Sequence, residues 1–355
     1  MKSLVSKLLL LTALPSVALI VGIWLFVQHS LNQPVVLGEN LDLNTQGDLL
    51  WTIDRGSGLS QVSFELDRLG VIEYPSFINA YAALLGSTTI QAGTYRIQPS
   101  DSARSLLDKF NRGDVVRYKI TFPEGWSFKQ WIAHMAKIAQ FSEIKFKSSA
   151  DILKLANIQV NHPEGWLFPD TYSYSDADSA YDILYQAHLE MQQTLDRAWQ
   201  KRCSNLPYQT PYEALIMASI IEKETGLAVE RSAIAGVFVR RLQRGMRLQT
   251  DPTVIYGMGD SYKGNIRRRD LLQTTAYNTY RIDGLPPTPI AMPGAAAIDA
   301  ALNPESGSSL YFVARGDGSH HFSDTIDEHH QAVRKYQINQ RQKNYQSMPK
   351  PELSP

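Results

Sequence analysis

The sequence contains a single cysteine, Cys203, among its 355 residues. One cysteine excludes an intramolecular disulfide, a zinc site built from several cysteines and a dithiol redox pair. The sequence also lacks an excess of either charge, because 35 Lys and Arg residues balance 35 Asp and Glu residues. Without a net positive field, we expect no nucleic-acid partner. The length suggests about two globular units, at roughly 150 residues per domain.

Long hydrophobic runs are also scarce, with one exception near the N-terminus. An uncharged run at 8–27 follows two lysines, and about twenty helical residues span a hydrocarbon core of about 30 Å. A cleaved signal peptide is the alternative, but its apolar region has about 7 to 15 residues and ends in small residues. We therefore predict a retained transmembrane helix at 8–27. By the positive-inside rule, residues 1–7 form a cytoplasmic tail and the rest of the chain is extracytoplasmic.

The remaining chain has the patterns of an α+β protein. Residues 28–48 are polar without a sustained period, which predicts a linker. We expect strands at 49–54, 93–97 and 115–122, and helices at 59–69, 75–85, 100–110 and 181–201. The predicted organisation is a small α+β module at 49–117, an intermediate region at 118–209, a second α+β domain at 210–340 and a C-terminal tail at 341–355.

The phrase Pro-Glu-Gly-Trp occurs twice, at 123–126 and 163–166. The surroundings of the two phrases differ, and repeat architectures need self-similarity over about 20 to 50 residues, so we do not interpret the phrase as a repeat. Aromatic residues nearby could stack on sugars, although large aromatic side chains more often pack in a core. Glu164 is a candidate acceptor for sugar hydroxyl groups.

A capped helix start at 210–213 opens the segment with most of the candidate chemistry. Thr, Pro and Glu have the spacing of a helix N-terminus there, and the apolar helix that follows stops at Gly226. Glu222 lies near the end of this helix, on the face of two small residues. Partial burial raises a carboxyl pKa, which suits a general acid near neutral pH. We predict Glu222 as the catalytic acid and interpret Lys223 and Glu224 as solvated residues.

Three downstream segments favour this catalytic role over that of a surface glutamate. The segments 245–257, 275–280 and 284–294 are rich in turn residues and hydrogen-bonding side chains. Proline and glycine at this density disfavour helices and central strands. We therefore expect loops of fixed shape, which often line functional sites.

These phrases are similar to those of the YceG/MltG family of endolytic murein transglycosylases. The similarity rests on ASIIEKET, RLQTDPTVIYG, TAYNTY, GLPPTPI and LYFVARGDGSHHFS, with AGTYRI and EGWLFPDTY upstream. Several long phrases in one order are far more specific than a single motif. The resemblance implies that 49–117 is a LysM-like module, that 210–340 is the catalytic transglycosylase domain and that Glu222 is the catalytic glutamate.

The resemblance also implies a lyase reaction at the bond between N-acetylmuramic acid and N-acetylglucosamine, which leaves a 1,6-anhydromuramoyl end. Glu222 would protonate the leaving oxygen and then take the proton of the muramic C6 hydroxyl as this attacks its own anomeric carbon. The tethered nucleophile gains the advantage of proximity and needs no second catalytic carboxylate. Candidates for orienting the sugar are Gln249, Asp251, Thr253, Tyr256, Asn278 and Tyr280.

Three alternative hypotheses remain open. The same domain could hydrolyse glycan by pairing Glu222 with Asp251 or another carboxylate, or it could be a non-catalytic glycan-binding division scaffold. A metal enzyme is the third, because histidines and acidic residues gather at 320–330, but no ligand spacing such as His-Glu-x-x-His occurs there. A polar surface explains that cluster, so we expect no metal and no cofactor.

The expected partners and location follow from the anchor and the resemblance. The single span would hold a periplasmic catalytic domain at the inner membrane, close to newly made peptidoglycan glycan strands. Cuts there would terminate or trim strand elongation. Contact with peptidoglycan synthases is inferred from the family resemblance.

Overall fold

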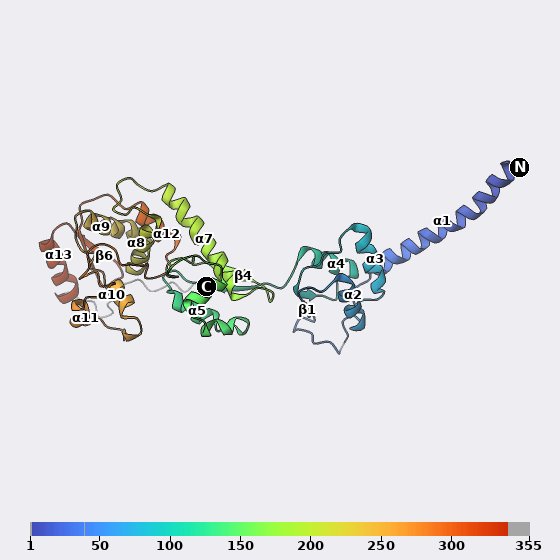
Figure 1. Ribbon diagram of the computed structural model, residues 1–355, viewed down its shortest axis with the longest axis horizontal. Helices are drawn as coiled ribbons and strands as arrows, with labels where there is room; N and C mark the ends of the chain where they lie inside the picture. Colours follow the sequence, from blue (N-terminus) through green and yellow to red (C-terminus); the bar gives the residue numbers. More distant parts are fainter. Residues whose placement is uncertain (1, 39, 340–355) are drawn as a thin grey trace. The chain divides into compact units, whose positions relative to one another are not determined.

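The computed structural model of the protein describes residues 2–38 and 40–339, with side chains described from Pro15 onward. Helices and short strands alternate along the chain, which confirms the α+β class (Figure 1). The described residues divide into two compact units: unit 1 runs to Lys119 and includes Ser173–Asp178, and unit 2 contains Ile120–Tyr172 and the described residues from Ser179 onward. The tail predicted at 341–355 lies outside the described residues.

The apolar N-terminal run forms the helix α1, Lys2–Asn32. Its 18 residues from Pro15 to Asn32 are long and apolar enough to cross a membrane, and almost none of this stretch is buried. A core helix of a soluble protein would bury such side chains. No other helix in the described parts of the chain meets these criteria.

The segment predicted as a linker, 28–48, contributes to the core of unit 1. The last turn of α1 buries Leu31, which is 2% exposed, and Val35 follows at 7%. The N–H of Val35 donates a hydrogen bond to the carbonyl oxygen of Asp101 at 2.8 Å. The mostly polar composition of this segment gave no indication that these two apolar residues are buried.

Unit 1 builds a small sheet and three helices onto the end of α1. Its elements are β1 (Leu49–Ile53), α2 (Leu59–Arg68), α3 (Pro75–Leu85), β2 (Gly93–Ile97) and α4 (Ala103–Arg112). β1 and β2 pair in antiparallel fashion, with Trp51 opposite Tyr95. Side chains from the helices, such as Leu66 and Leu106, are fully buried beside this sheet. The predicted positions of these elements are confirmed to within a few residues.

Two short strands lie where the chain passes between the units. The predicted strand at 115–122 is shorter in the structure, where β3 (Tyr118–Thr121) pairs with β4 (Thr171–Tyr174). The hydroxyl groups of Thr121 and Thr171 lie 2.8 Å apart.

Unit 2 is mostly helical. Its α-helices are α5 (Phe128–Met135), α6 (Ser149–Leu155), α7 (Ala180–Gln200), α8 (Pro211–Glu224), α9 (Arg231–Gln243), α10 (Asp251–Met258), α11 (Arg268–Leu272), α12 (Ala295–Leu302) and α13 (Ile326–Val333). Short 3₁₀-helical segments are η1 (Ala139–Phe146), η2 (Ala228–Glu230) and η3 (Gly259–Ser261), and η4 (Arg334–Asn339) is a short π-helical segment. The strands β5 (Tyr311–Ala314) and β6 (His320–Ser323) form an antiparallel hairpin.

Helix α8 lies at the centre of unit 2. Every residue from Ala214 to Ile221 is buried, which is the pattern of a helix covered on all sides. It packs against α7, α9 and α12. Thr210 caps it as predicted, because its side chain accepts the N–H of Glu213 at 3.2 Å and the Glu213 carboxylate accepts the N–H of Thr210 at 3.2 Å. The N-terminal cap and the packing along its length therefore fix the position of α8 in unit 2.

The expectation of loops at 245–257 is wrong for its second half. Asp251–Met258 forms α10, because Pro252 falls in the first turn, where its missing N–H is not needed. The segments 275–280 and 284–294 contain neither helix nor strand and are confirmed as loops.

Candidate active site

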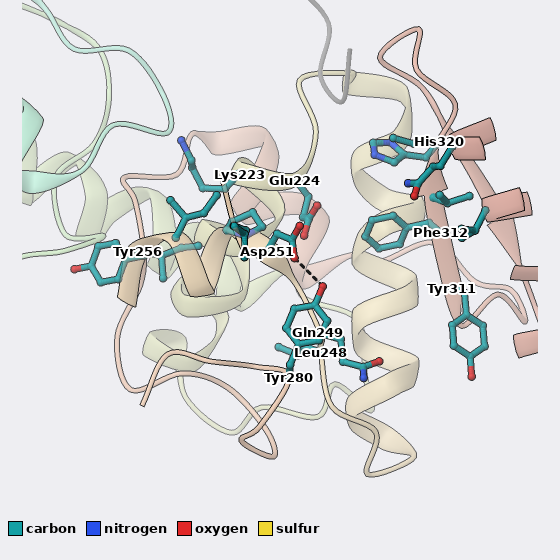
Figure 2. Close-up of a pocket in the computed structure, with 18 of the residues that line it drawn as sticks. Lys223, Glu224, Leu248, Gln249, Asp251, Tyr256, Tyr280, Tyr311, Phe312 and His320 are labelled. Carbon is teal, nitrogen blue, oxygen red and sulfur yellow. Dashed lines mark hydrogen bonds between the residues drawn. The ribbon is translucent and has the colours of Figure 1, made fainter. Parts of the chain in front are cut away.

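Unit 2 contains a pocket of about 1100 Å³ beside the C-terminal end of α8. Figure 2 shows its wall, which is built from the end of α8, the start of α10 and the hairpin of β5 and β6. The polar and aromatic residues of this wall include Lys223, Glu224, Gln249, Asp251, Tyr256 and Tyr280. Four of the six residues predicted to orient a sugar are among them.

Glu224, the last residue of α8, places its carboxyl group in this wall. The hydroxyl of Thr250 donates a hydrogen bond to its Oε1. Burial raises the pKa of Glu224 to about 7, the Thr250 hydrogen bond opposes this rise, and the negative charge of Asp251 adds to it. A carboxyl group with a pKa near neutrality can both give and take a proton at physiological pH.

Glu222, the predicted catalytic acid, is not part of the pocket wall. Its Oε2 accepts a hydrogen bond from the N–H of Gly294 at 3.0 Å, and Gly294 is the N-cap residue of α12. Burial raises the pKa of Glu222, with the Gly294 hydrogen bond acting against the rise. The side chain therefore pairs with one of the free N–H groups at a helix N-terminus.

Helix geometry separates the two glutamates. Residues two positions apart on an α-helix project about 200° from each other, so Glu222 and Glu224 point to nearly opposite sides of α8. One side meets α12 and the other meets the pocket. Glu224 was interpreted from the sequence as a solvated residue, and that interpretation is wrong, because its carboxyl group is buried in the pocket wall.

Thr253 is fully buried and does not reach the pocket. Its hydroxyl donates to the carbonyl oxygen of Thr250 at 2.8 Å and lies 2.9 Å from the hydroxyl of Thr279. Thr279 in turn accepts the N–H of Thr250 at 3.0 Å. These three threonines therefore hold the backbone that presents the Thr250 hydroxyl to Glu224.

Asn278 is also buried, at 1% exposure, and shapes a loop. Its amide nitrogen donates to three backbone carbonyl oxygens, including that of Gln273 at 2.6 Å. Its side-chain oxygen accepts the N–H of Tyr280 at 3.0 Å. Asn278 thus positions Tyr280 and has no group left over for a sugar.

Tyr280 and Gln249 are each held by a polar partner at the pocket. The Tyr280 hydroxyl donates to Oδ1 of Asp251 at 2.7 Å, as the dashed line in Figure 2 shows. Gln249 adopts a left-handed backbone with φ of 53°, and its side-chain oxygen accepts a hydrogen bond from the guanidinium of Arg241. Arg241 is buried and also donates to the carbonyl oxygen of Arg247 at 2.8 Å. The sequence offered no signal for this buried arginine.

Tyr256 connects the pocket to a second buried carboxyl group. Its hydroxyl donates to Oε2 of Glu164 at 3.1 Å, and the N–H of Phe128 donates to Oε1 at 2.9 Å. Glu164 is 3% exposed, and burial raises its pKa to about 7. Tyr256 and Glu164 also line a second pocket of about 690 Å³. Glu164 was a candidate acceptor for sugar hydroxyls, and the hydroxyl it accepts here belongs to a tyrosine.

The histidine-rich segment forms polar and ring contacts. Nδ1 of His320 lies 2.8 Å from Oε2 of Glu230. The other carboxyl oxygen of Glu230 accepts a hydrogen bond from the backbone N–H of His320 at 2.9 Å. The ring of His329 stacks on Tyr311 with 5.2 Å between centroids. Within residues 2–38 and 40–339, no group of three or more His, Cys, Asp or Glu side chains is placed to hold a metal ion.

A pocket wall with a protonatable carboxyl group, a neighbouring acidic side chain and positioned tyrosines is typical of enzymes that act on polar substrates. The chain belongs to the YceG-like family, whose sequence profile matches residues 51–335.

The chain is 30% identical over 336 residues to the endolytic murein transglycosylase of Bacillus subtilis strain 168, covering 90% of this chain and 91% of that protein. It is 27% identical over 329 residues to the endolytic murein transglycosylase of Streptococcus pneumoniae R6, covering 82% of this chain but 59% of that longer protein. A crystal structure of a YceG-like protein from Listeria monocytogenes is 31% identical, with a TM-score of 0.47, covering 80% of this chain and 98% of that one.

Proposed function

We propose that this protein is a lytic transglycosylase that cuts the glycan strands of peptidoglycan, with Glu224 as its general acid. The relatives named endolytic murein transglycosylases support the reaction class. One structural observation carries the residue assignment: Glu224 sits in the wall of the pocket, and its pKa is raised to about 7. Glu222, the acid expected from sequence, is engaged with the N-terminus of α12 instead.

In the proposed mechanism Glu224 acts twice. The protonated carboxyl group gives its proton to the oxygen that leaves the anomeric carbon of N-acetylmuramic acid, and that C–O bond breaks. The carboxylate then takes the proton of the C6 hydroxyl of the same sugar, whose oxygen bonds to the anomeric carbon. The product is a 1,6-anhydromuramoyl end, Glu224 regains its proton, and no water is consumed. The nucleophile is tethered to its target, so one acid–base group suffices.

Four of the predicted sugar-orienting residues keep that role in the proposal, namely Gln249, Asp251, Tyr256 and Tyr280, which line the pocket. Asp251 and the tyrosine hydroxyls can bond sugar hydroxyls and stabilise positive charge at the anomeric carbon. Thr253 and Asn278 act indirectly, because both are buried and fully engaged within the protein.

Asp251, which lines the same pocket as Glu224, supports hydrolysis as an alternative reaction. A glycosidase uses two carboxyl groups, one as acid and one as nucleophile or base for water. Glu224 and Asp251 line the same pocket, so hydrolysis with Asp251 as the second group is the second candidate function.

The remaining expectations extend the proposal to the whole protein. The order of strand, two helices and strand in β1, α2, α3 and β2 supports a LysM-like module at 49–117 that binds glycan. The apolar helix α1 supports a single-pass anchor, with the N-terminus in the cytoplasm and the enzyme on the periplasmic side of the inner membrane. Placement there would bring peptidoglycan synthases within reach as partners.

Mass analysis of products from intact peptidoglycan tests the function and the residue together. The purified full-length chain is expected to release fragments with 1,6-anhydromuramoyl ends. Glu224→Gln is expected to lower the rate by about 10²- to 10⁴-fold, the usual contribution of a general acid. Glu222→Gln, the matched control, keeps an oxygen for the Gly294 N–H and should retain most activity.

Each other outcome assigns a different function. Reducing ends in place of anhydro ends would identify a hydrolase. Loss of activity in Glu222→Gln with activity kept in Glu224→Gln would return the acid role to Glu222. A parent chain that leaves peptidoglycan intact would indicate a glycan-binding scaffold.

A further inference from the structure

The outward face of α3 carries no charge, which is unusual for a surface helix. None of its eleven residues is an Asp, Glu, Lys, Arg or His, and its exposed positions are Ser76, Ala80, Ala83, Leu84 and Leu85. Leu84 is 82% exposed and Leu85 is 58% exposed. A helix packed on a soluble domain normally presents charged or polar residues to water. Neighbouring helices follow that rule, because α2 exposes Asp67 and Arg68 and α4 exposes Arg104 and Asp108.

This uncharged face is continuous with the end of α1. The ring of Phe26 lies 5.9 Å from that of Tyr74 and 6.0 Å from that of Phe77, in edge-on contacts. Tyr74 is the N-cap residue of α3 and is 47% exposed, and its ring stacks on Phe77 at 5.2 Å. Figure 1 shows α3 beside the end of α1 within unit 1.

The aromatic cluster has the composition of a membrane interface. Phe26 lies one residue before the end of the apolar run, and Trp24 lies two residues earlier and is 58% exposed. Trp and Tyr are enriched where a protein passes from hydrocarbon to headgroups, since their rings are apolar and their N–H or O–H groups stay wet. A helix held at this level by Phe26 would meet the headgroup layer, where exposed leucine and alanine are stable.

We propose that the Ala80, Ala83, Leu84 and Leu85 face of α3 lies in the headgroup region of the lipid bilayer that α1 spans. Apolar side chains on a helix in the interfacial plane leave water without crossing the membrane. The contact would fix unit 1 against the bilayer at two points, the span and α3. This inference rests on the span included in the proposed function, but it is independent of the catalytic assignment.

Lipid-borne quenchers test the contact in the full-length chain. The chain carries Cys203→Ser, which removes the lone exposed thiol, and one new cysteine with a fluorescent label. It is reconstituted into phosphatidylcholine and phosphatidylglycerol vesicles that contain a lipid with a nitroxide close to its headgroup. Test positions are Ala80→Cys and Leu84→Cys on α3. Ser60→Cys and Asp67→Cys, exposed on α2, are matched controls.

Labels at 80 and 84 are expected to lose fluorescence in the nitroxide vesicles, whereas labels at 60 and 67 keep it. A Leu84→Glu and Leu85→Glu double substitution should restore the fluorescence of the label at 80 without a change in melting temperature, because both leucines are largely exposed. A label at 84 that is quenched no more than that at 67 would refute the contact.

Two further outcomes are decisive. A label at Gly22→Cys within α1 reports the span itself. If the label at residue 22 is not quenched by lipids that carry the nitroxide along their acyl chains, α1 does not span the bilayer. The proposed α3 contact is then wrong as well, whereas the catalytic proposal is unaffected. A label at 84 that is shielded from water yet not quenched by lipid would assign the face to a second copy of the chain, and the proposal would be wrong.

Discussion

The hydroxyl of Thr250 sets the proton affinity of Glu224. It donates a hydrogen bond to the carboxylate, which favours the charged form and holds the pKa below the value that burial alone would produce. Thr250→Val removes the bond at constant shape, so the pKa of Glu224 should rise above about 7. Because the acid works while protonated, the alkaline limb of the kcat/KM profile on soluble glycan strands should move to higher pH.

Thr250→Ser provides the control for that shift, because it keeps the hydroxyl and should keep the position of the alkaline limb. The assignment of Glu224 as the acid would be contradicted by identical limbs in the parent and the valine variant.

The stability of unit 2 is expected to depend on pH through the ionisation of Glu164. Its pKa is raised from an ordinary value of 4.5 to about 7 in the folded protein, so its contribution to stability is fully present below pH 4.5. It is lost as the pH rises through about 7, because ionisation then occurs in a buried site. Glu164→Gln cannot ionise. Relative to the parent, it should gain on the order of 3 kcal/mol between pH 4.5 and pH 8.

Thermal melts of the two chains across that pH range measure this difference. If the melting temperatures of the two chains keep a constant difference across the pH range, Glu164 is ionised throughout or its site is open to water. Asp151 at the start of α6 is fully exposed, and Asp151→Asn serves as a control that should not show the trend.

At the level of single residues, sequence patterns indicated much of the pocket wall, and the proposed change of acid from Glu222 to Glu224 rests on tertiary packing. Glu222, the turn-rich phrase after 245 and Tyr280 were expected at the site, whereas Glu224 was interpreted as a solvated residue. In the structure Glu224, Asp251 and Tyr280 line one pocket. The choice between two glutamates two positions apart depends on which side of α8 meets α12. That contact comes from a distant loop, and helical periodicity alone does not reveal it.

The close approach of two loops predicts an asymmetry between glycines. Gly165 has a φ of +84°, and a Cβ there would lie 2.5 Å from Cγ of Pro289. Gly284 has a similar φ of +79° with nothing within 4 Å. Gly284→Ala should therefore cost about 1 kcal/mol for its backbone conformation alone. Gly165→Ala should cost roughly 1 to 3 kcal/mol more, because the rigid proline ring has to move.

Melting temperatures of the two alanine variants test this difference at matched backbone geometry. Equal losses would show that the loop of Pro289 yields easily. In that case the Pro-Glu-Gly-Trp phrase at 163–166 would not depend on glycine for packing.

Elements with strong local signals were the ones that could be predicted. The helix α3 and the strand β2 occupy the predicted ranges. For α3 the signals are Pro75 in the first turn, the glycine stop at Gly86 and the apolar spacing between them. Helix α10 was missed because Asp251 and Pro252 resemble turn residues, although proline in a first turn favours a helix. Buried polar partners such as Arg241 and Thr279 were not predictable, because their environment arises from tertiary packing.

Within the described residues, each unit has an apolar core of its own. One gathers around Leu66, Tyr95 and Phe110 in unit 1, and the other around α8 in unit 2. The length of the chain predicted two units, and the structure divides it near residue 119. The return of 173–178 to unit 1 had no sequence signal, because a six-residue segment carries too little apolar pattern to indicate its partners.

The N-terminal boundary of unit 1 yields a prediction for the whole chain. A chain that begins at residue 28 loses the apolar span but keeps Leu31 and Val35, whereas one that begins at residue 37 loses both core residues. Loss of buried side chains of this size costs roughly 2 to 5 kcal/mol. Hydrogen exchange should therefore accelerate in β2 and α4 of the shorter chain, while α8 in the other core stays protected. Equal protection of β2 in both chains would show that residues 28–36 act as a linker, as their composition suggests, and that unit 1 begins at β1.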